Sequence, residues 1–212
     1  MRKMNGKERI VSALNLKPVD RTPVWFMRQA GRHLPEYRKI AAENTFWERC
    51  MDAELCSEIT LQPIQRYKTI DAAIIFSDIL TPLPSLGYTV EYGGGIRIDK
   101  FELEDIDDRI NFSARKHAPW AADGLKSLGE KSDNSIAHLG FVGSPWTIAM
   151  YLLSGGTGDK DFHNARAKVY SNPDCFLNHI VHHLIAIFLQ QSFYSRCLEK
   201  GYQKFFHLDL DK

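Results

Sequence analysis

Residues 71–80, DAAIIFSDIL, place a short apolar run with two adjacent isoleucines directly before a Ser-Asp pair. An apolar run without polar alternation is typical of a strand covered on both faces, as in a parallel sheet. Asp78 follows this strand, and the carboxyl ends of parallel strands line the site in α/β proteins. A catalytic or ligand-binding acid is therefore expected at Asp78. The alternative is a helix cap, although Pro82 and Pro84 disfavour a long helix here.

The neighbouring segments predict more strands and helices in alternation, which favours βα units and a parallel sheet. We count three or four such units, whereas a complete eight-fold barrel needs roughly 250 residues. The 212-residue chain is therefore expected to supply about half a barrel. The expected strands are 23–26, 71–76 and 135–143, with a hairpin over 88–98 and strand-like alternation over 204–210. The expected helices are one capped by Asn5, then 35–43, 52–66 (bent or ended by Pro63), 118–129, 145–155, 160–171 and 174–190.

Composition and charge narrow the class of protein. The chain has 44% hydrophobic and 25% charged residues, as in an ordinary globular domain, and a formal net charge of +1. This charge gives no reason to expect nucleic acid as a partner. No apolar run reaches the roughly 18 residues of a membrane span, and no signal sequence is evident, so a cytoplasmic location is expected. The cysteines Cys50, Cys56, Cys175 and Cys197 form no C-x-x-C motif and are interpreted as buried thiols.

A basic loop follows the expected strand at 23–26. In RQAGR, Arg28 and Arg32 flank Gly31, which lets the backbone approach a ligand closely. Arginine binds carboxylate or phosphate through two parallel hydrogen bonds, so the pair could form a receptor for a polyanion. The alternative is a solvated basic loop. Because this loop and Asp78 both follow candidate parallel strands, both could face one pocket.

The third strand leads into GFVGSPWTIAMYLLSGG, residues 140–156, where a glycine-rich turn precedes a helix that begins at Pro145. Tyr151 falls on this helix and could reach the site with its hydroxyl, although packing in the core is the alternative. SGGTGDK is not a phosphate-binding loop, since it lacks the Walker pattern and follows a helix. The histidines of 179–183, HIVHH, lack the companion residues of a zinc motif, so no metal site is expected.

Three long segments resemble the uroporphyrinogen decarboxylase family. They are PVWFMRQAGRHLPEYR (23–38), ELCSEITLQPIQRYKTIDAAIIFSDIL (54–80) and GFVGSPWTIAMYLLSGG (140–156). The resemblance runs in order from about residue 5 to about residue 190. It implies a TIM-type (β/α)8 barrel, of which this chain carries about the first half, with the cleft at the carboxyl ends of its strands, and typically a homodimer.

The resemblance also implies an activity and a set of site residues. The activity is decarboxylation of the four acetate side chains of uroporphyrinogen III, an octacarboxylate tetrapyrrole, to give coproporphyrinogen III without a metal or organic cofactor. By position, Arg28 and Arg32 bind substrate carboxylates, while Asp78 faces the pyrrole N–H groups and Tyr151 lies near the reacting acetate. The remaining implied substrate-binding residues are Gln29, Ala30 and Gly31, through their backbone, and Phe46, as an apolar wall.

The resemblance ends before the chain does. Residues 1–190 are expected to be the N-terminal part of one barrel domain, and residues 191–212 a divergent tail from a truncated or shifted reading frame. The chain alone is then expected to be inactive. Two other functions stay open: a corrinoid-dependent methyltransferase of the related barrel group, which uses a His-x-Cys pair that is absent here, and a non-catalytic remnant that binds porphyrinogen.

Overall fold

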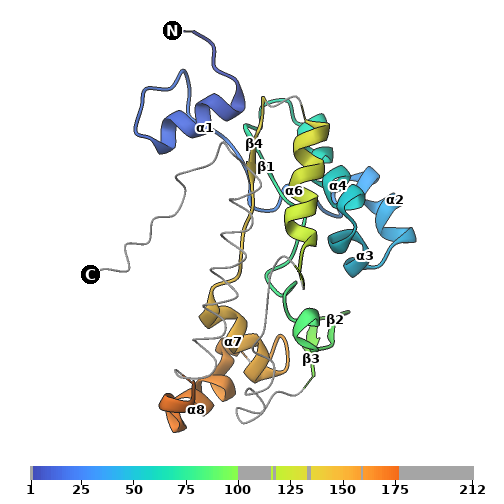
Figure 1. Ribbon diagram of the computed structural model, residues 1–212, viewed down its shortest axis with the longest axis vertical. Helices are drawn as coiled ribbons and strands as arrows, with labels where there is room; N and C mark the ends of the chain where they lie inside the picture. The colour runs from blue at the N-terminus through green and yellow to red at the C-terminus, as the bar shows by residue number, and fades with distance from the viewer. Residues whose placement is uncertain (1, 100–115, 117, 133–134, 159, 177–212) are drawn as a thin grey trace.

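The computed structural model describes residues 2–99, 116, 118–132, 135–158 and 160–176, so the expected elements at 174–190 (beyond Phe176) and 204–210 lie outside it. Figure 1 shows the arrangement of the described elements. The helices are α1 (Gly6–Leu14), α2 (Pro35–Glu43), α3 (Phe46–Met51), α4 (Ala53–Arg66), α6 (Trp120–Lys131), α7 (Pro145–Ser154), α8 (His163–Ser171), α9 (Pro173–Cys175) and the 3-10 turns η1 (Pro84–Leu86) and η3 (Lys160–Phe162). The strands are β1 (Ala72–Ile74), β2 (Val90–Tyr92), β3 (Ile96–Ile98) and β4 (Ala137–Leu139).

Two buried parallel strands form the centre of the fold. β1 pairs with β4 in parallel, with Ala72 opposite Ala137 and Ile74 opposite Leu139. Successive side chains of a strand point to opposite faces. Ala72 accordingly packs with Ile10 of α1, whereas Ala73 packs against α4 and α6, and Figure 1 shows α1 on one side of the strand pair with α4 and α6 on the other. The parallel strands expected at 71–76 and 135–143 are confirmed, each with a short hydrogen-bonded core.

Helix signals in the sequence match the described helices closely. Asn5 caps α1 by accepting a hydrogen bond from Glu8 N at 2.8 Å, and Pro35 opens α2. Pro63 lies inside α4, which continues to Arg66 instead of ending at the proline. Because Pro63 lies in the last turns, only one internal hydrogen bond is lost before the helix stops.

The expected strand at 23–26 is not formed. These residues are joined to β1 at one point, where Asp71 N donates to Val24 O and Val24 N donates to the Asp71 carboxylate, both at 2.8 Å. Pro23 has no N–H to donate, and the structure assigns no strand to 22–26. The segment is therefore held beside β1 by a side chain rather than by a strand ladder.

Asp71 is the centre of a buried ionic network at the amino end of β1. Its carboxylate accepts from Arg9 and from both terminal nitrogens of Arg21, the latter at 2.8 Å each. Arg9, 3% exposed, also forms two hydrogen bonds with Asp20, at 2.7 and 2.9 Å. The Arg9 guanidinium holds the pKa of Asp20 well below its usual range. The network ties α1 and the 20–24 segment to the start of β1.

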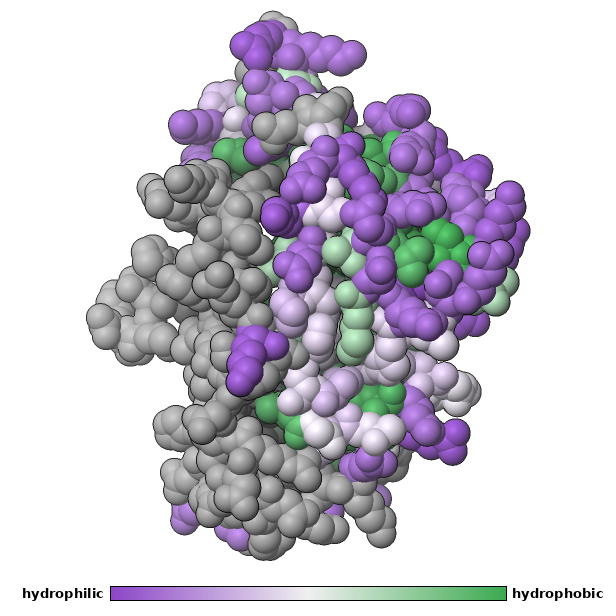
Figure 2. All heavy atoms as spheres, turned by 45° about the vertical axis from the view of Figure 1, so that its right-hand side comes forward, coloured by the Kyte–Doolittle hydropathy of each residue, from purple (hydrophilic) through white to green (hydrophobic). Residues whose placement is uncertain are grey.

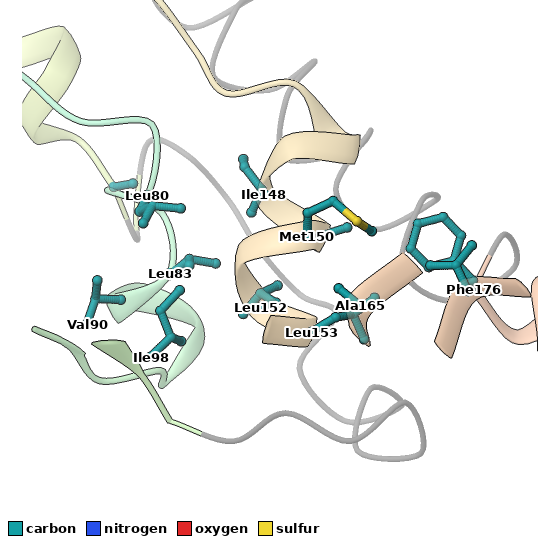
Figure 3. Close-up of a cluster of buried hydrophobic side chains, with 13 residues drawn as sticks. Leu80, Leu83, Val90, Ile98, Ile148, Met150, Leu152, Leu153, Ala165 and Phe176 are labelled. Carbon is teal, nitrogen blue, oxygen red and sulfur yellow. The ribbon is translucent and has the colours of Figure 1, made fainter. Parts of the chain in front are cut away.

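A second layer packs below the parallel strands. Leu80, Leu83, Val90 and Ile98, from the chain after β1, face α7 across a buried apolar cluster (Figure 3). Its α7 side is formed by Ile148, Met150, Leu152 and Leu153, and Ala165 of α8 and Phe176 extend it. The hairpin expected at 88–98 is confirmed as β2 paired antiparallel with β3.

The hairpin is fixed to the segment that follows α7. Thr157 N donates to Ile96 O at 2.8 Å, and Ile98 N donates to Gly155 O at 3.0 Å. Gly156 has φ 122°, and a Cβ there would lie 2.0 Å from Ile96 O. The SGGTG segment thus ends a helix and docks a hairpin, in agreement with its rejection as a phosphate loop.

The outer face of α2, α4 and α6 carries charged residues. Arg66 pairs with Glu36 at 2.7 Å and Lys131 with Glu54 at 2.8 Å. Figure 2 turns this side forward and shows hydrophilic residues over its upper and right-hand parts, with paler residues lower down. No helix of the described residues is long and apolar enough to cross a membrane.

Breaking the Asp71 network should destabilise the fold. Arg9→Met leaves the Asp20 carboxylate without its cation and Asp71 with Arg21 alone, so the free energy of unfolding should fall by roughly 3 kcal/mol, the low end for a broken buried ion pair. Urea denaturation followed by circular dichroism measures the change. Arg2→Met is the matched control, because the Arg2–Glu8 pair is exposed; equal effects of the two substitutions would contradict the assigned role of Arg9.

Gly156→Ala should release the hairpin, because the added Cβ collides with the Ile96 carbonyl and the backbone conformation disfavours any side chain. Hydrogen exchange at the Thr157 and Ile98 amides should accelerate by at least an order of magnitude while the β1–β4 amides keep their protection. Gly93→Ala is the control, since a Cβ there meets nothing within 4 Å. Unchanged exchange at Thr157 in Gly156→Ala would refute the docking.

Candidate active site

Asp78 lies where the chain leaves the carboxyl end of β1. Its Oδ1 accepts from Leu80 N at 2.8 Å, and its carbonyl accepts from Thr81 Oγ1 at 2.9 Å. These bonds fold residues 78–83 into tight turns that lead to η1, with no long helix after Asp78. Asp78 therefore caps a turn, and its half-buried carboxylate stays at the strand end where a site was expected.

The β2–β3 hairpin brings Tyr92 to this carboxylate. The Tyr92 hydroxyl is buried and has no hydrogen-bond partner among the described residues. Burial raises the pKa of Tyr92, and the neighbouring negative charge of Asp78 raises it further. Cys50 and Tyr151 also lie close enough to affect this hydroxyl. The sequence predictions missed Tyr92, although the alternation Val90-Glu91-Tyr92 placed Val90 and Tyr92 on one face of the strand.

Aromatic rings enclose one side of the Asp78 region. The Phe46 ring lies 4.2 Å from the Tyr92 ring and 6.0 Å from that of Phe76, measured between centroids. The buried Arg49 guanidinium lies 5.8 Å from the centre of the Phe46 ring. Trp47 Nε1 donates to Val90 O at 2.8 Å, which ties α3 to the hairpin. Phe46 thus lies in an aromatic wall beside the end of β1, where the resemblance expected an apolar wall.

Tyr151 approaches the same region from α7. It is half-buried, packs against the lower apolar cluster, and forms an edge contact with Phe162 at 5.3 Å between centroids. Gly143, in the loop before α7, lets this loop meet the Asp78 turn: a Cβ on it would lie 2.9 Å from Ile79 Cβ. The structure therefore brings Asp78, Tyr151 and Phe46 together, with Tyr92 among them.

The RQAGR loop lies against the same strand end. Ala30 packs onto the cluster of Leu34, Tyr37 and Ile59 that also contacts Phe76. Gln29 is buried and its Oε1 accepts from Phe26 N at 3.0 Å, whereas its Nε2 has no partner among the described residues. Gly31 has φ 154°, which glycine adopts readily.

The two arginines of this loop are exposed. Neither Arg28 nor Arg32 forms an ion pair within the described part of the chain. Arg38, one turn into α2, instead donates to the Arg32 carbonyl at 2.8 Å. Arg28 and Arg32 are therefore available to an anion from outside the described chain, and Arg38 supports the loop backbone.

Cys50 and Cys56 are buried thiols, as expected. Burial raises the pKa of Cys56 to about 12 and raises that of Cys50 as well, with a further contribution from the charge of Asp78. The side chain of Cys175, together with Cys197 and the histidines of 179–183, lies outside the described residues. Within those residues, no group of three or more His, Cys, Asp and Glu side chains is arranged to hold a metal ion.

These features define a class: an α/β protein whose candidate site is a carboxylate beside a buried tyrosine at the carboxyl end of a buried parallel strand. The profile of the family described as Uroporphyrinogen decarboxylase (URO-D) matches residues 5–193. The chain therefore belongs to the uroporphyrinogen decarboxylase family.

Individual relatives agree with this assignment. Uroporphyrinogen decarboxylase of Pseudomonas paraeruginosa is 43% identical over 171 residues, and that of Chromohalobacter salexigens is 42% identical over 172 residues. Each alignment covers 78% of this chain and 48% of the relative, so the chain spans about half the length of these curated relatives. A solved methyltransferase from Methanosarcina mazei resembles the fold with a TM-score of 0.62 over 92% of this chain and 56% of that protein, at 16% identity.

The raised thiol pKa values predict unreactive cysteines in the folded protein. At pH 8, below the raised values, Cys50 and Cys56 are protonated and buried, so both should resist iodoacetamide, as peptide mapping by mass spectrometry can show. The same reaction in denaturant is the control and should label both residues quickly. Rapid labelling of Cys56 in the native protein would contradict the described packing.

Proposed function

We propose that the protein carrying this chain decarboxylates the four acetate side chains of uroporphyrinogen III to give coproporphyrinogen III. The observation that carries the proposal is the half-buried Asp78 carboxylate beside the buried Tyr92 hydroxyl, near a loop with two arginines that have no ion-pair partner in the described chain. The names of the relatives support the same reaction. We further propose that β1 and β4 belong to a (β/α)8 barrel, of which this chain supplies about half.

The proposed chemistry needs a stabilised cation. Loss of CO2 from an acetate on a pyrrole leaves an electron pair, which the ring accepts once a proton has been added to a ring carbon. The protonated ring is cationic, and the Asp78 carboxylate would bind its N–H groups and stabilise that charge. A second proton then completes the methyl group, and the proton on the ring carbon leaves to restore the neutral pyrrole. The rings of Phe46 and Phe76 shelter this side of Asp78 from water, which strengthens the interaction.

The arginines would supply the orientation. Arg28 and Arg32 would bind side-chain carboxylates of the substrate through paired hydrogen bonds, so that one acetate is held near Tyr151. The buried side chains of Gln29 and Leu34 fix the loop that carries both arginines. The loop would thus bind the carboxylates of the substrate, while Asp78 would act on the pyrrole ring that reacts.

Further parts of the proposal concern the assembly. We propose a homodimer in the cytoplasm that uses no metal or organic cofactor. We also propose that the 212-residue chain does not catalyse the decarboxylation by itself, because it spans about half the length of its relatives. The methyltransferase likeness supports the fold alone, and the sequence has no His-x-Cys pair to favour that activity.

The test is anaerobic incubation of the full-length protein with uroporphyrinogen III, followed by chromatography of the oxidised products. Coproporphyrinogen should form; tight substrate binding without CO2 release would instead identify a binding protein. The same assay on the 212-residue chain should give no product.

Substitutions should separate the two parts of the site. Asp78→Asn should lower kcat at least a hundredfold, because it removes the charge opposite the cationic ring. Arg32→Ala should raise KM roughly tenfold, the value of one charge-assisted hydrogen bond. Arg166→Ala, exposed on α8, is the control and should change neither. Full activity of Asp78→Asn would refute the assigned site.

A further inference from the structure

We propose that Tyr92 is a positioning residue, whose hydroxyl donates a hydrogen bond to the Asp78 carboxylate oxygen that the turn leaves free. This inference rests on the proposed function and adds a residue that the sequence did not indicate. It assigns the β2–β3 hairpin a part in the reaction.

The position of Tyr92 is fixed from three directions. Its ring packs against Phe46 at 4.2 Å and against Trp47 at 5.4 Å between centroids. The Trp47 indole holds the same strand, β2, through Val90 O at 2.8 Å. The far strand of the hairpin is anchored at Gly156, where the backbones meet with no room for a side chain. A ring held so tightly loses little rotamer freedom when its hydroxyl forms a new bond.

The Tyr92 hydroxyl has an unused hydrogen-bond donor, and the Asp78 carboxylate has an unused acceptor. The Tyr92 hydroxyl is buried without a partner among the described residues, a state that costs free energy until an acceptor is found. Asp78 Oδ1 is used by Leu80 N, and no hydrogen bond to Oδ2 occurs in the described chain. An ionised carboxylate oxygen has two lone-pair sites. Oδ2 can therefore accept from Tyr92 and still accept a pyrrole N–H.

The hydroxyl acts as a donor and not as a base. Its raised pKa keeps Tyr92 protonated at any working pH. The described titratable groups beside it are Asp78, Cys50 and Tyr151, and the pKa of the Cys50 thiol is raised too. Arg49 is the cation that acts on Cys50. Donation from Tyr92 thus holds the orientation of the Asp78 carboxylate.

One experiment follows activity in the full-length protein. Tyr92→Phe removes only the hydroxyl, so the ring contacts remain; kcat should fall roughly 10- to 100-fold, the rate equivalent of a hydrogen bond to a charged group, with KM changed less than threefold. A fall in kcat with KM nearly unchanged is a split that a merely structural substitution would not give. Tyr170→Phe, 76% exposed on α8, is the control and should leave both unchanged. An unaltered kcat in Tyr92→Phe would overturn the proposal.

A second experiment needs no activity and keeps Tyr92 in place. With 13C-labelled tyrosine at pH 7, Asp78→Asn should change the chemical shift of the Tyr92 ring carbon that bears the hydroxyl, while the Tyr170 signal stays constant. If the wild type fails to decarboxylate but this shift occurs, the proposed function fails and the contact stands. If the Tyr92 signal is the same in both proteins, the Tyr92–Asp78 interaction is disproved whatever the activity.

Discussion

The fold depends on the buried carboxylate of Asp71, which holds two distant segments at the start of β1. Arg9 of α1 and Arg21 both donate to it, and Val24 N completes the set. Without these bonds the 20–26 segment has no strand ladder to keep it beside β1. The RQAGR loop directly follows this segment, so the location of the basic loop is set by an interaction at the opposite end of the strand.

One strand therefore carries two carboxylates with different surroundings. Asp71 at the amino end is 2% exposed and its charge is neutralised by arginines. Asp78 at the carboxyl end is half-buried, accepts a single backbone N–H on its side chain, and lies beside Tyr92. The first arrangement is suited to stability and the second to binding a ligand that brings its own donors. In parallel βα folds, residues at the carboxyl ends of the strands form the active site, and residues at the amino ends contribute to stability.

Local signals predicted the parts of the structure that local forces decide. The apolar runs around Ile75 and Ala137 form the parallel strand pair because both faces of each strand are covered. The glycine-rich turn before Tyr151 leads into α7, as predicted. The failures involve distant contacts. Residues 23–26 look like a strand but depend on a side chain some fifty positions later, and Tyr92 joins the site only because Gly156 permits the hairpin to dock. Neither dependence leaves a periodic pattern in the sequence.

The central claim is that a polycarboxylated tetrapyrrole binds at the carboxyl end of β1. A crystal structure of the full-length protein with coproporphyrinogen bound tests it most directly. Pyrrole N–H groups should lie within hydrogen-bonding distance of Asp78, ligand carboxylates should bind Arg28 and Arg32, and the Phe46 ring should pack against the macrocycle. A ligand bound elsewhere, with Asp78 facing only water, would contradict it.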